Sequence, residues 1–181
     1  MRVEKMNNKE YDIPFAGLKP GKHEFKYEID NTFFEGFEFF DFNDADIRLL
    51  VELERMNTML ELKMQASGTV NLDCDLTSEP FDQEIAADLD LVVKFGEEYN
   101  NEDDEILVIP HGEHQINIAQ YIYEMLVLAV PPKRIHPGVA DGSLKSEALK
   151  KLEELSPKES NNRSKETDPR WDALKDLKTD N

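Results

Sequence analysis

Two histidines stand close to a run of acidic residues, a combination that could bind a metal. His111 and His114 are three residues apart and follow Asp103-Asp104-Glu105. Neutral imidazole and carboxylate are good ligands, but a bound cation needs three or four of them converging on one point. The sequence Pro110-His111-Gly112 predicts a loop rather than a helix. A loop does not place residues three positions apart on the same side of the chain as a helix would. A solvated loop is the favoured interpretation, so we predict no metal site and no other cofactor.

Cys74 is the second candidate for chemistry. A reactive thiol needs a neighbouring base and a lowered pKa. Cys74 stands at the end of an alternating apolar run that begins at Leu60, which is typical of a small buried residue closing a strand. Because it is the chain's single cysteine, an intrachain disulfide is excluded, which fits a reducing, cytoplasmic setting.

Sequence motifs for phosphate binding and acyl transfer are absent. The glycines are scattered, with no GxGxxG or GKS/T loop and no G-x-S-x-G elbow. Carboxylates are abundant everywhere, so no acid/base pair stands out. We predict that the protein is not an enzyme. Two alternatives stay open: a metal-dependent RNA-processing hydrolase, which needs carboxylates converging in a cleft, and a small-ligand-binding β-barrel, which needs an apolar cavity.

Negative charge is concentrated in the first three quarters of the chain. The 39 Asp and Glu residues exceed the 21 Lys and Arg residues, for a net charge of −18. Residues 1–137 carry −17 of it and residues 138–181 carry −1. Such a surface repels nucleic-acid phosphates and anionic lipids, which argues against DNA coating and membrane docking. The same surface could recruit a basic partner, because −17 exceeds what solubility requires.

Neither a secretory signal nor a membrane span is apparent. Residues 1–10 are polar. The longest apolar stretch, 116–130, is too short for a bilayer and contains Asn117, Gln120 and Glu124. We therefore expect a soluble, cytoplasmic protein.

Hydrophobic periodicity predicts the elements that would position any site. Apolar residues alternate with polar ones over 23–29, 47–53, 60–74 and 81–95, the pattern of half-buried strands, and Gly68 marks a bend or a bulge. A short strand is expected over 106–109. Asp30 is a candidate N-cap for a helix whose face carries Phe33, Phe37 and Phe40. Residues 116–130 have helical spacing and end at Pro131-Pro132, which predicts a core helix.

These elements indicate an α+β protein. Neighbouring strands joined by short turns favour a mainly antiparallel sheet, as a meander or an open barrel, with the core helix packed on it. We expect residues 1–137 to form this acidic globular domain and residues 138–181 to form a polar, largely flexible tail with helical segments.

The tail is expected to end in a short helix that carries an interaction motif. Asp168 is the expected N-cap and Pro169 the first helical residue, while Trp171, Leu174 and Leu177 share one face. The pair Arg170 and Trp171 is typical of interface anchors. Trp171 could equally fold back onto its own sheet.

Four stretches in order along the chain together resemble the YceD family, the large ribosomal RNA subunit accumulation proteins. They are Ile13-Pro14-Phe15 with Gly17-Leu18-Lys19, residues 68–75 with Glu79-Pro80-Phe81, residues 116–137, and Asp168-Pro169-Arg170-Trp171 with Leu174 and Leu177. Many members carry C-x-x-C at the cysteine turn. Here Cys74 matches the first cysteine and Thr77 replaces the second, which puts any paired-thiol or metal role in doubt.

The resemblance implies a role in large ribosomal subunit biogenesis, through the synthesis, processing or stability of the 23S ribosomal RNA. It implies no enzymatic activity. Because an acidic body gains no counterion release from RNA, the resemblance and the charge agree if the ribosomal RNA is met indirectly. We therefore expect the partner to be a basic ribosomal protein or a pre-large-subunit particle.

Overall fold

The computed structural model describes residues 9–103 and 105–156, which belong to two compact units, Met1–Leu144 and Lys145–Asn181. In the second unit the described element is helix α4 (Glu147–Leu155). Its N-cap is Ser146, whose hydroxyl accepts a hydrogen bond from the Ala148 N–H at 3.2 Å. The first unit contains everything described below.

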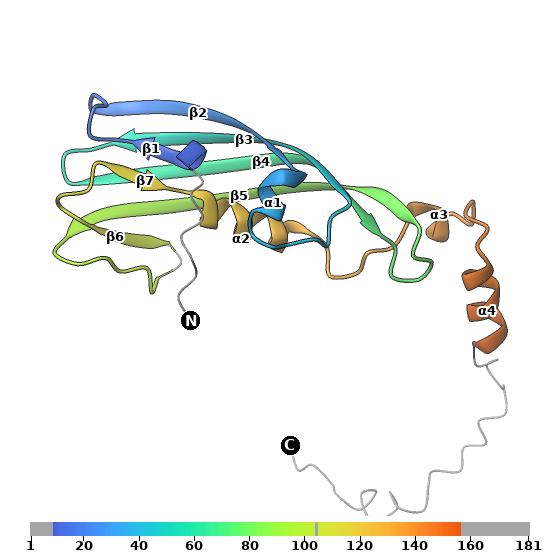
Figure 1. The fold of residues 1–181 in the computed structure, drawn as a ribbon. Coiled ribbons are helices and arrows are strands. Elements are labelled where there is room, and N and C mark those ends of the chain that lie inside the picture. Colours follow the sequence, from blue (N-terminus) through green and yellow to red (C-terminus); the bar gives the residue numbers. More distant parts are fainter. Residues whose placement is uncertain (1–8, 104, 157–181) are drawn as a thin grey trace, which may run out of the picture. The chain divides into compact units, whose positions relative to one another are not determined.

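A five-stranded open sheet forms the first unit, with strand order β2-β3-β4-β5-β6 (Figure 1). The strands are β2 (Gly21–Asp30), β3 (Asp44–Arg55), β4 (Met59–Asp73), β5 (Pro80–Gly96) and β6 (Ile106–Pro110). Strands β2 to β5 form an antiparallel meander, which confirms the predicted fold class. Strand β6 departs from the meander because it pairs with β5 in parallel.

Alternating burial explains why these segments are strands. The inner face is apolar and buried, and the residues between the apolar ones are polar and face solvent. The inner face of β4 shows the pattern over its whole length, with Leu60, Leu62, Met64, Ala66, Val70 and Leu72 all buried.

Gly68 interrupts the apolar series of β4 without interrupting the pairing. It lies opposite Ile47 and Ile85 in an uninterrupted ladder, so the strand has no bulge at this position. Instead, a Cβ at this position would lie 2.1 Å from the Asp46 carbonyl oxygen. Glycine is required here because the backbones of β3 and β4 approach too closely for any side chain.

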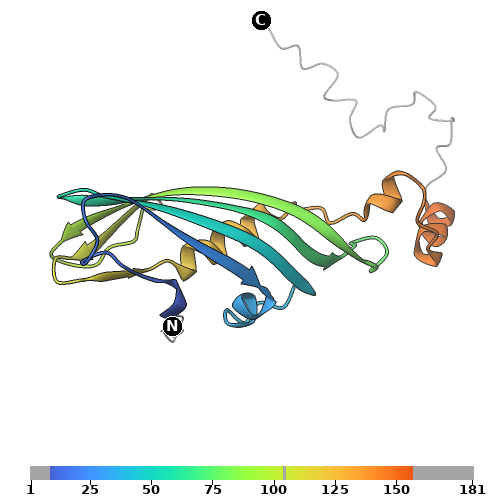
Figure 2. The ribbon, with the colours of Figure 1, turned by 90° about the horizontal axis from the view of Figure 1, so that it is seen from above.

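Helices and a small second sheet cover the inner face, and Figure 2 shows α1 and α2 on the same side of the curved sheet. These elements are the 3₁₀ helix η1 (Lys9–Tyr11), β1 (Asp12–Pro14), α1 (Asn31–Glu35), β7 (Gln115–Asn117) and α2 (Ala119–Ala129). Helix α3 (Pro137–Ala140) lies at one end of the sheet (Figure 1). The predicted core helix is confirmed in α2, which packs on β5. Its predicted start at residue 116 is wrong, because Ile116 pairs with Ile13 in the antiparallel β1–β7 sheet.

Helix α1 begins as predicted and ends earlier. The Asp30 carboxylate accepts the Thr32 N–H at 2.9 Å, which caps the helix. The helix ends at Glu35, so the predicted face that would include Phe40 is wrong, and that side chain is 74% exposed. The chain turns at Glu38, whose φ is +57°. The turn directs Phe37 onto Tyr123 of α2, with ring centroids 4.4 Å apart.

The helices are all short. Within residues 9–103 and 105–156, no helix is long and apolar enough to cross a membrane.

Candidate functional site

The cysteine turn, Cys74–Glu79, connects β4 to β5. The Cys74 N–H donates to the Glu79 carbonyl oxygen at 3.0 Å, and the Ser78 N–H donates to the Cys74 carbonyl oxygen at 2.8 Å. Ser78 has a φ of +56° in the left-handed region, and it reverses the chain within this loop. These bonds close the β4–β5 hairpin and place the Cys74 side chain on the buried face.

The Cys74 sulfur is surrounded by hydrogen-bond donors. The His136 N–H donates to Sγ at 3.3 Å, and Thr77 donates through its hydroxyl. Burial raises the pKa of the Cys74 thiol, but the donors from His136, Thr77 and Leu76 together outweigh it and lower the pKa below its usual value. The thiol is nevertheless buried, with 2% of its residue surface exposed. The turn therefore lowers the pKa of a thiol that is buried.

The segment after α2 is bound to the cysteine turn. The Asp75 N–H donates to the Arg134 carbonyl oxygen at 2.8 Å, and the Arg134 N–H donates to the Asp75 carboxylate at 2.9 Å. The His136 ring packs against Phe81, and its Nδ1 accepts the Gly138 N–H at 2.9 Å, which caps α3. Sulfur, carboxylate and imidazole thus join two segments about sixty positions apart in the chain.

The residue at position 77 bears on whether this turn could hold a metal or form a disulfide. Thr77 stands where the resemblance implies a second cysteine, and its hydroxyl donates to Cys74. Across the part of the chain that the structure describes, no three His, Cys, Asp or Glu side chains converge as metal ligands do. The geometry therefore fits a structural clamp.

The two histidines of the loop region are also apart from any ligand set. His111 stacks on Phe95 with ring centroids 6.4 Å apart. The His114 carbonyl oxygen accepts the N–H groups of Phe15 and Ala16 at 3.1 and 3.2 Å. The rings are exposed, as the interpretation of a solvated loop requires.

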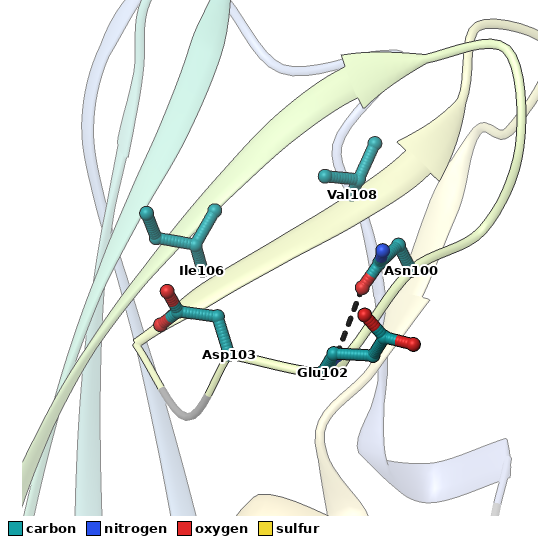
Figure 3. A pocket seen from close by; sticks show the side chains of 5 residues that line it. All are labelled: Asn100, Glu102, Asp103, Ile106 and Val108. Carbon is teal, nitrogen blue, oxygen red and sulfur yellow. Dashed lines mark hydrogen bonds between the residues drawn. The ribbon is translucent and has the colours of Figure 1, made fainter.

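A hollow of about 410 Å³ lies between the β5–β6 connection and β6. Figure 3 shows the side chains that line it, which are Asn100, Glu102, Asp103, Ile106 and Val108. The Asn100 side-chain oxygen accepts the Glu102 N–H at 2.8 Å, which shapes its rim. Three of the five lining residues are polar. This hollow therefore lacks the apolar lining that a small-ligand barrel requires, and the sheet that carries it is open rather than closed.

The outer face of the sheet gathers much of the negative charge. By the strand register its acidic residues are Glu24, Glu28, Asp30, Asp44, Asp46, Glu52, Glu54, Glu61, Asp73, Asp82, Glu84, Asp88 and Asp90. Its basic residues are Lys22, Lys26, Arg48, Lys63 and Lys94. The described residues form two ion pairs, and only the one between Lys22 and Glu52, at 2.8 Å, lies on this face. Most of these carboxylates thus form no ion pair within the described residues.

One end of this face has no cation among its registered residues. We define the acidic end as Asp30, Asp44, Asp46, Asp73, Asp82 and Glu84, which lie together by register. Amide side chains link part of it: Asn71 donates to Asp82 at 2.7 Å, and Asn43 donates to Asp73 at 2.9 Å. Since Asp73 precedes the cysteine turn directly, the acidic end and the clamp are adjacent.

Sequence reasoning found some of these residues and missed others. Cys74 and Thr77, which the sequence singled out, both lie in the cysteine turn, whereas the residues of the predicted tail motif, 168–177, lie outside the described residues. The contacts of Arg134 and His136 with the turn were missed. The available signal was the polar run between Pro132 and Pro137, which is too rigid and too charged for an ordinary linker.

Comparison with known proteins gives one match. A family model for the large ribosomal RNA subunit accumulation protein YceD matches residues 62–178, which include the cysteine turn, the segment bound to it and the predicted tail motif. Neither a curated protein nor a solved structure matches. The matched stretch covers more than half of the 181 residues, and the chain therefore belongs to the YceD family.

Proposed function

We propose that this protein is a non-catalytic factor in large ribosomal subunit biogenesis, which supports accumulation of the 23S ribosomal RNA by binding a basic ribosomal protein or a pre-large-subunit particle. The family description supports the connection with large-subunit RNA. The outer face of the sheet supports the choice of a basic partner. Contact with the RNA is then indirect.

The observation that carries this proposal is the acidic end. Six carboxylates lie together there without a registered cation among them. Repulsion among them raises the free energy of the isolated surface, and a polycationic segment would relieve it. The face is built on paired strands, so its charges are held in place before a partner arrives.

Electrostatics also supports indirect contact with RNA. Binding to a phosphate backbone gains its free energy from cations that displace condensed counterions. An acidic face carries the same sign of charge as the RNA and the opposite sign to a basic ribosomal protein. We infer that this factor shields the charge of such a protein until the RNA takes the place of the factor.

The central experiment is affinity purification of the full chain at about 0.15 M salt, where exposed charges are screened beyond roughly 8 Å. Bound proteins are identified by mass spectrometry and bound RNA by sequencing. We expect a basic large-subunit protein or a pre-large-subunit particle, and a deletion strain should accumulate less large-subunit RNA. Recovery of neither, together with normal RNA levels in the deletion strain, would contradict the proposal.

A matched pair of variants tests the face itself. The first carries Asp44→Asn, Asp46→Asn, Asp82→Asn and Glu84→Gln at the acidic end. The control carries Glu97→Gln, Glu98→Gln, Glu102→Gln and Glu113→Gln at exposed loop positions, which removes the same charge.

At roughly 0.5–1 kcal/mol for each exposed charge contact, the first variant should bind the recovered partner at least about tenfold more weakly. The control should bind within about twofold of wild type, since its residues lie outside the proposed face. Equal weakening of both variants would mean that net charge, and not this face, attracts the partner.

A further inference from the structure

Strand β2 is an unprotected edge of the sheet. Figure 1 shows it along one border, where β3 is its strand neighbour. Its ten residues pair with β3 one for one, from Gly21 opposite Arg55 to Asp30 opposite Asp46, without a bulge. Within the described residues, no backbone group of β2 bonds to a backbone outside the β2–β3 ladder. A long, regular edge of this kind is a template for another strand.

The charges along β2 alternate in sign from Lys22 to Glu28, and Asp30 ends the strand. On the outer face the order is Lys22, Glu24, Lys26 and Glu28, and all four side chains are exposed. Glu24 stands opposite Glu52, a carboxylate that already binds Lys22. Glu24 therefore has a like charge across from it within its own sheet, which is destabilising.

We propose that β2 pairs with β2 of a second copy of this chain, antiparallel and about a two-fold axis through Phe25. In that register Lys22 lies opposite Glu28 of the second copy, and Glu24 lies opposite Lys26 of the second copy. The axis generates each pair twice, so these four residues of each copy meet the opposite sign. Such an isologous contact closes at two copies, as most homo-oligomers do.

Neighbouring registers do not offer this match. Outer-face residues must meet outer-face residues, so the register can move only in steps that shift the axis by one residue. An axis through Glu24 places that residue against itself and Lys22 against Lys26. An axis through Lys26 places Lys26 against itself and Glu24 against Glu28. Phe25 is thus the one centre at which Lys22, Glu24, Lys26 and Glu28 are all paired favourably, while Asp30 extends past the end of the partner strand.

The opposite edge of the sheet carries charges that disfavour pairing with a second copy of itself. Strand β6 pairs with β5 only from Val92 to Gly96, so the earlier part of β5 has β4 as its one strand neighbour among the described residues. The outward charges of that part are Asp82, Glu84, Asp88 and Asp90, with no cation between them. Self-pairing along β5 brings carboxylate against carboxylate in every register, whereas β2 lacks this protection.

The inner face of β2 has the residues to complete the contact. Phe25 and Tyr27 are half-buried in the single chain. In the proposed register, Phe25 meets Phe25 of the second copy, and His23 meets Tyr27 of the second copy. Cross-strand aromatic pairs are among the stronger ones in sheets. The two-fold axis is perpendicular to the sheet, so both acidic outer faces lie on one side of a continuous ten-stranded sheet.

The test is the mass of the full chain in solution, measured by sedimentation at about 0.15 M salt, where repulsion between the two acidic bodies is largely screened. Concentrations up to roughly 100 μM reveal even a weak interface. We expect twice the mass of one chain. A single-chain mass throughout this range would overturn the proposal.

Charge exchange tests the register. Lys26→Glu and Glu24→Lys should each weaken self-association at least tenfold, which corresponds to about 1.4 kcal/mol, because each turns both copies of one pair repulsive. Mixing the two variants should restore a dimer that contains one of each, since every pair is then opposite in sign. Lys63→Glu, on the same face but away from the edge, changes the charge as Lys26→Glu does and should leave the dimer intact. A dimer indifferent to both edge variants, or no dimer in the mixture, would refute pairing through β2.

Discussion

Replacing Gly68 with alanine tests how closely β3 and β4 approach each other. The new Cβ would lie 2.1 Å from the Asp46 carbonyl oxygen and 2.6 Å from the Ile47 Cα. Carbon contacts are favourable at about 3.5–4.0 Å, so each distance is short by roughly 1 Å. Both opposing atoms belong to the backbone, and no side-chain rotation can relieve the clash. The two strands must separate locally and stretch the ladder on either side.

The expected cost of Gly68→Ala is roughly 3 kcal/mol of unfolding free energy. Overpacking a well-packed core typically costs about 1–3 kcal/mol, and each weakened ladder hydrogen bond adds about 1 kcal/mol. Acting against this, alanine reduces the entropy of the unfolded chain and stabilises by about 0.4–1 kcal/mol where the backbone accepts it. The steric term is larger, so the variant is destabilised.

Urea denaturation followed by circular dichroism measures this change. With a slope of about 2 kcal/mol per molar, the midpoint should fall by roughly 1.5 M. Ser67→Ala is the control, because Ser67 is exposed on the outer face beside Gly68, and its effect should stay within about 0.5 kcal/mol. A Gly68→Ala variant at least as stable as wild type, with an unchanged slope, would refute the close approach and revive the interpretation of a bulge.

Two further predictions concern buried groups. Cys74→Ala removes the acceptor of the part-buried His136 N–H and should cost about 1–3 kcal/mol in chemical denaturation. Cys74→Ser keeps an acceptor and should cost less. Equal losses for the two variants would mean that the hydrogen bond to sulfur contributes little. Burial, with Glu10 and Asp30 nearby, raises the pKa of Tyr11 to about 12, so the folded state favours the neutral phenol. The contribution of Tyr11 to the free energy of unfolding is therefore complete below pH 10 and is lost between pH 10 and 12. Wild type should lose about 1.4 kcal/mol per pH unit more than Tyr11→Phe over that interval, and parallel stability curves for the two proteins would contradict this assignment.

Four of the five strands of the main sheet were predictable because one face is buried and the other is not. Alternation in residues 60–74 reports this asymmetry directly, and each neighbour along the chain is also the neighbour in the sheet. Where pairing is long-range, the pattern fails. Ile116 fits helical spacing with the residues after it, yet it pairs with Ile13, because a partner so distant leaves no periodic trace.

The sequence predicted the acidic character of the candidate site but not where its residues lie in the fold. Net charge indicated an acidic body, but the placement of Asp44, Asp82 and Glu84 at one end of one face depends on strand register. The Cys74 turn was predictable from a resemblance. The donors around its sulfur come partly from His136, sixty-two positions away, and local propensity contains no information about that contact.

The β1–β7 pair can form only after the strands of the meander have been synthesised. Asp12 bonds to the side chains of Gln115 and Asn117, 103 and 105 positions away, whereas each strand of the meander pairs with the strand made just before it. Closing a long loop is entropically costly and slow, while hairpins form early. As the chain is synthesised, β2 to β5 can therefore assemble in succession. The N-terminal segment must wait until residue 117 has emerged, so it pairs after the meander has formed. By the same reasoning, its amide hydrogens should exchange earlier than those of the meander.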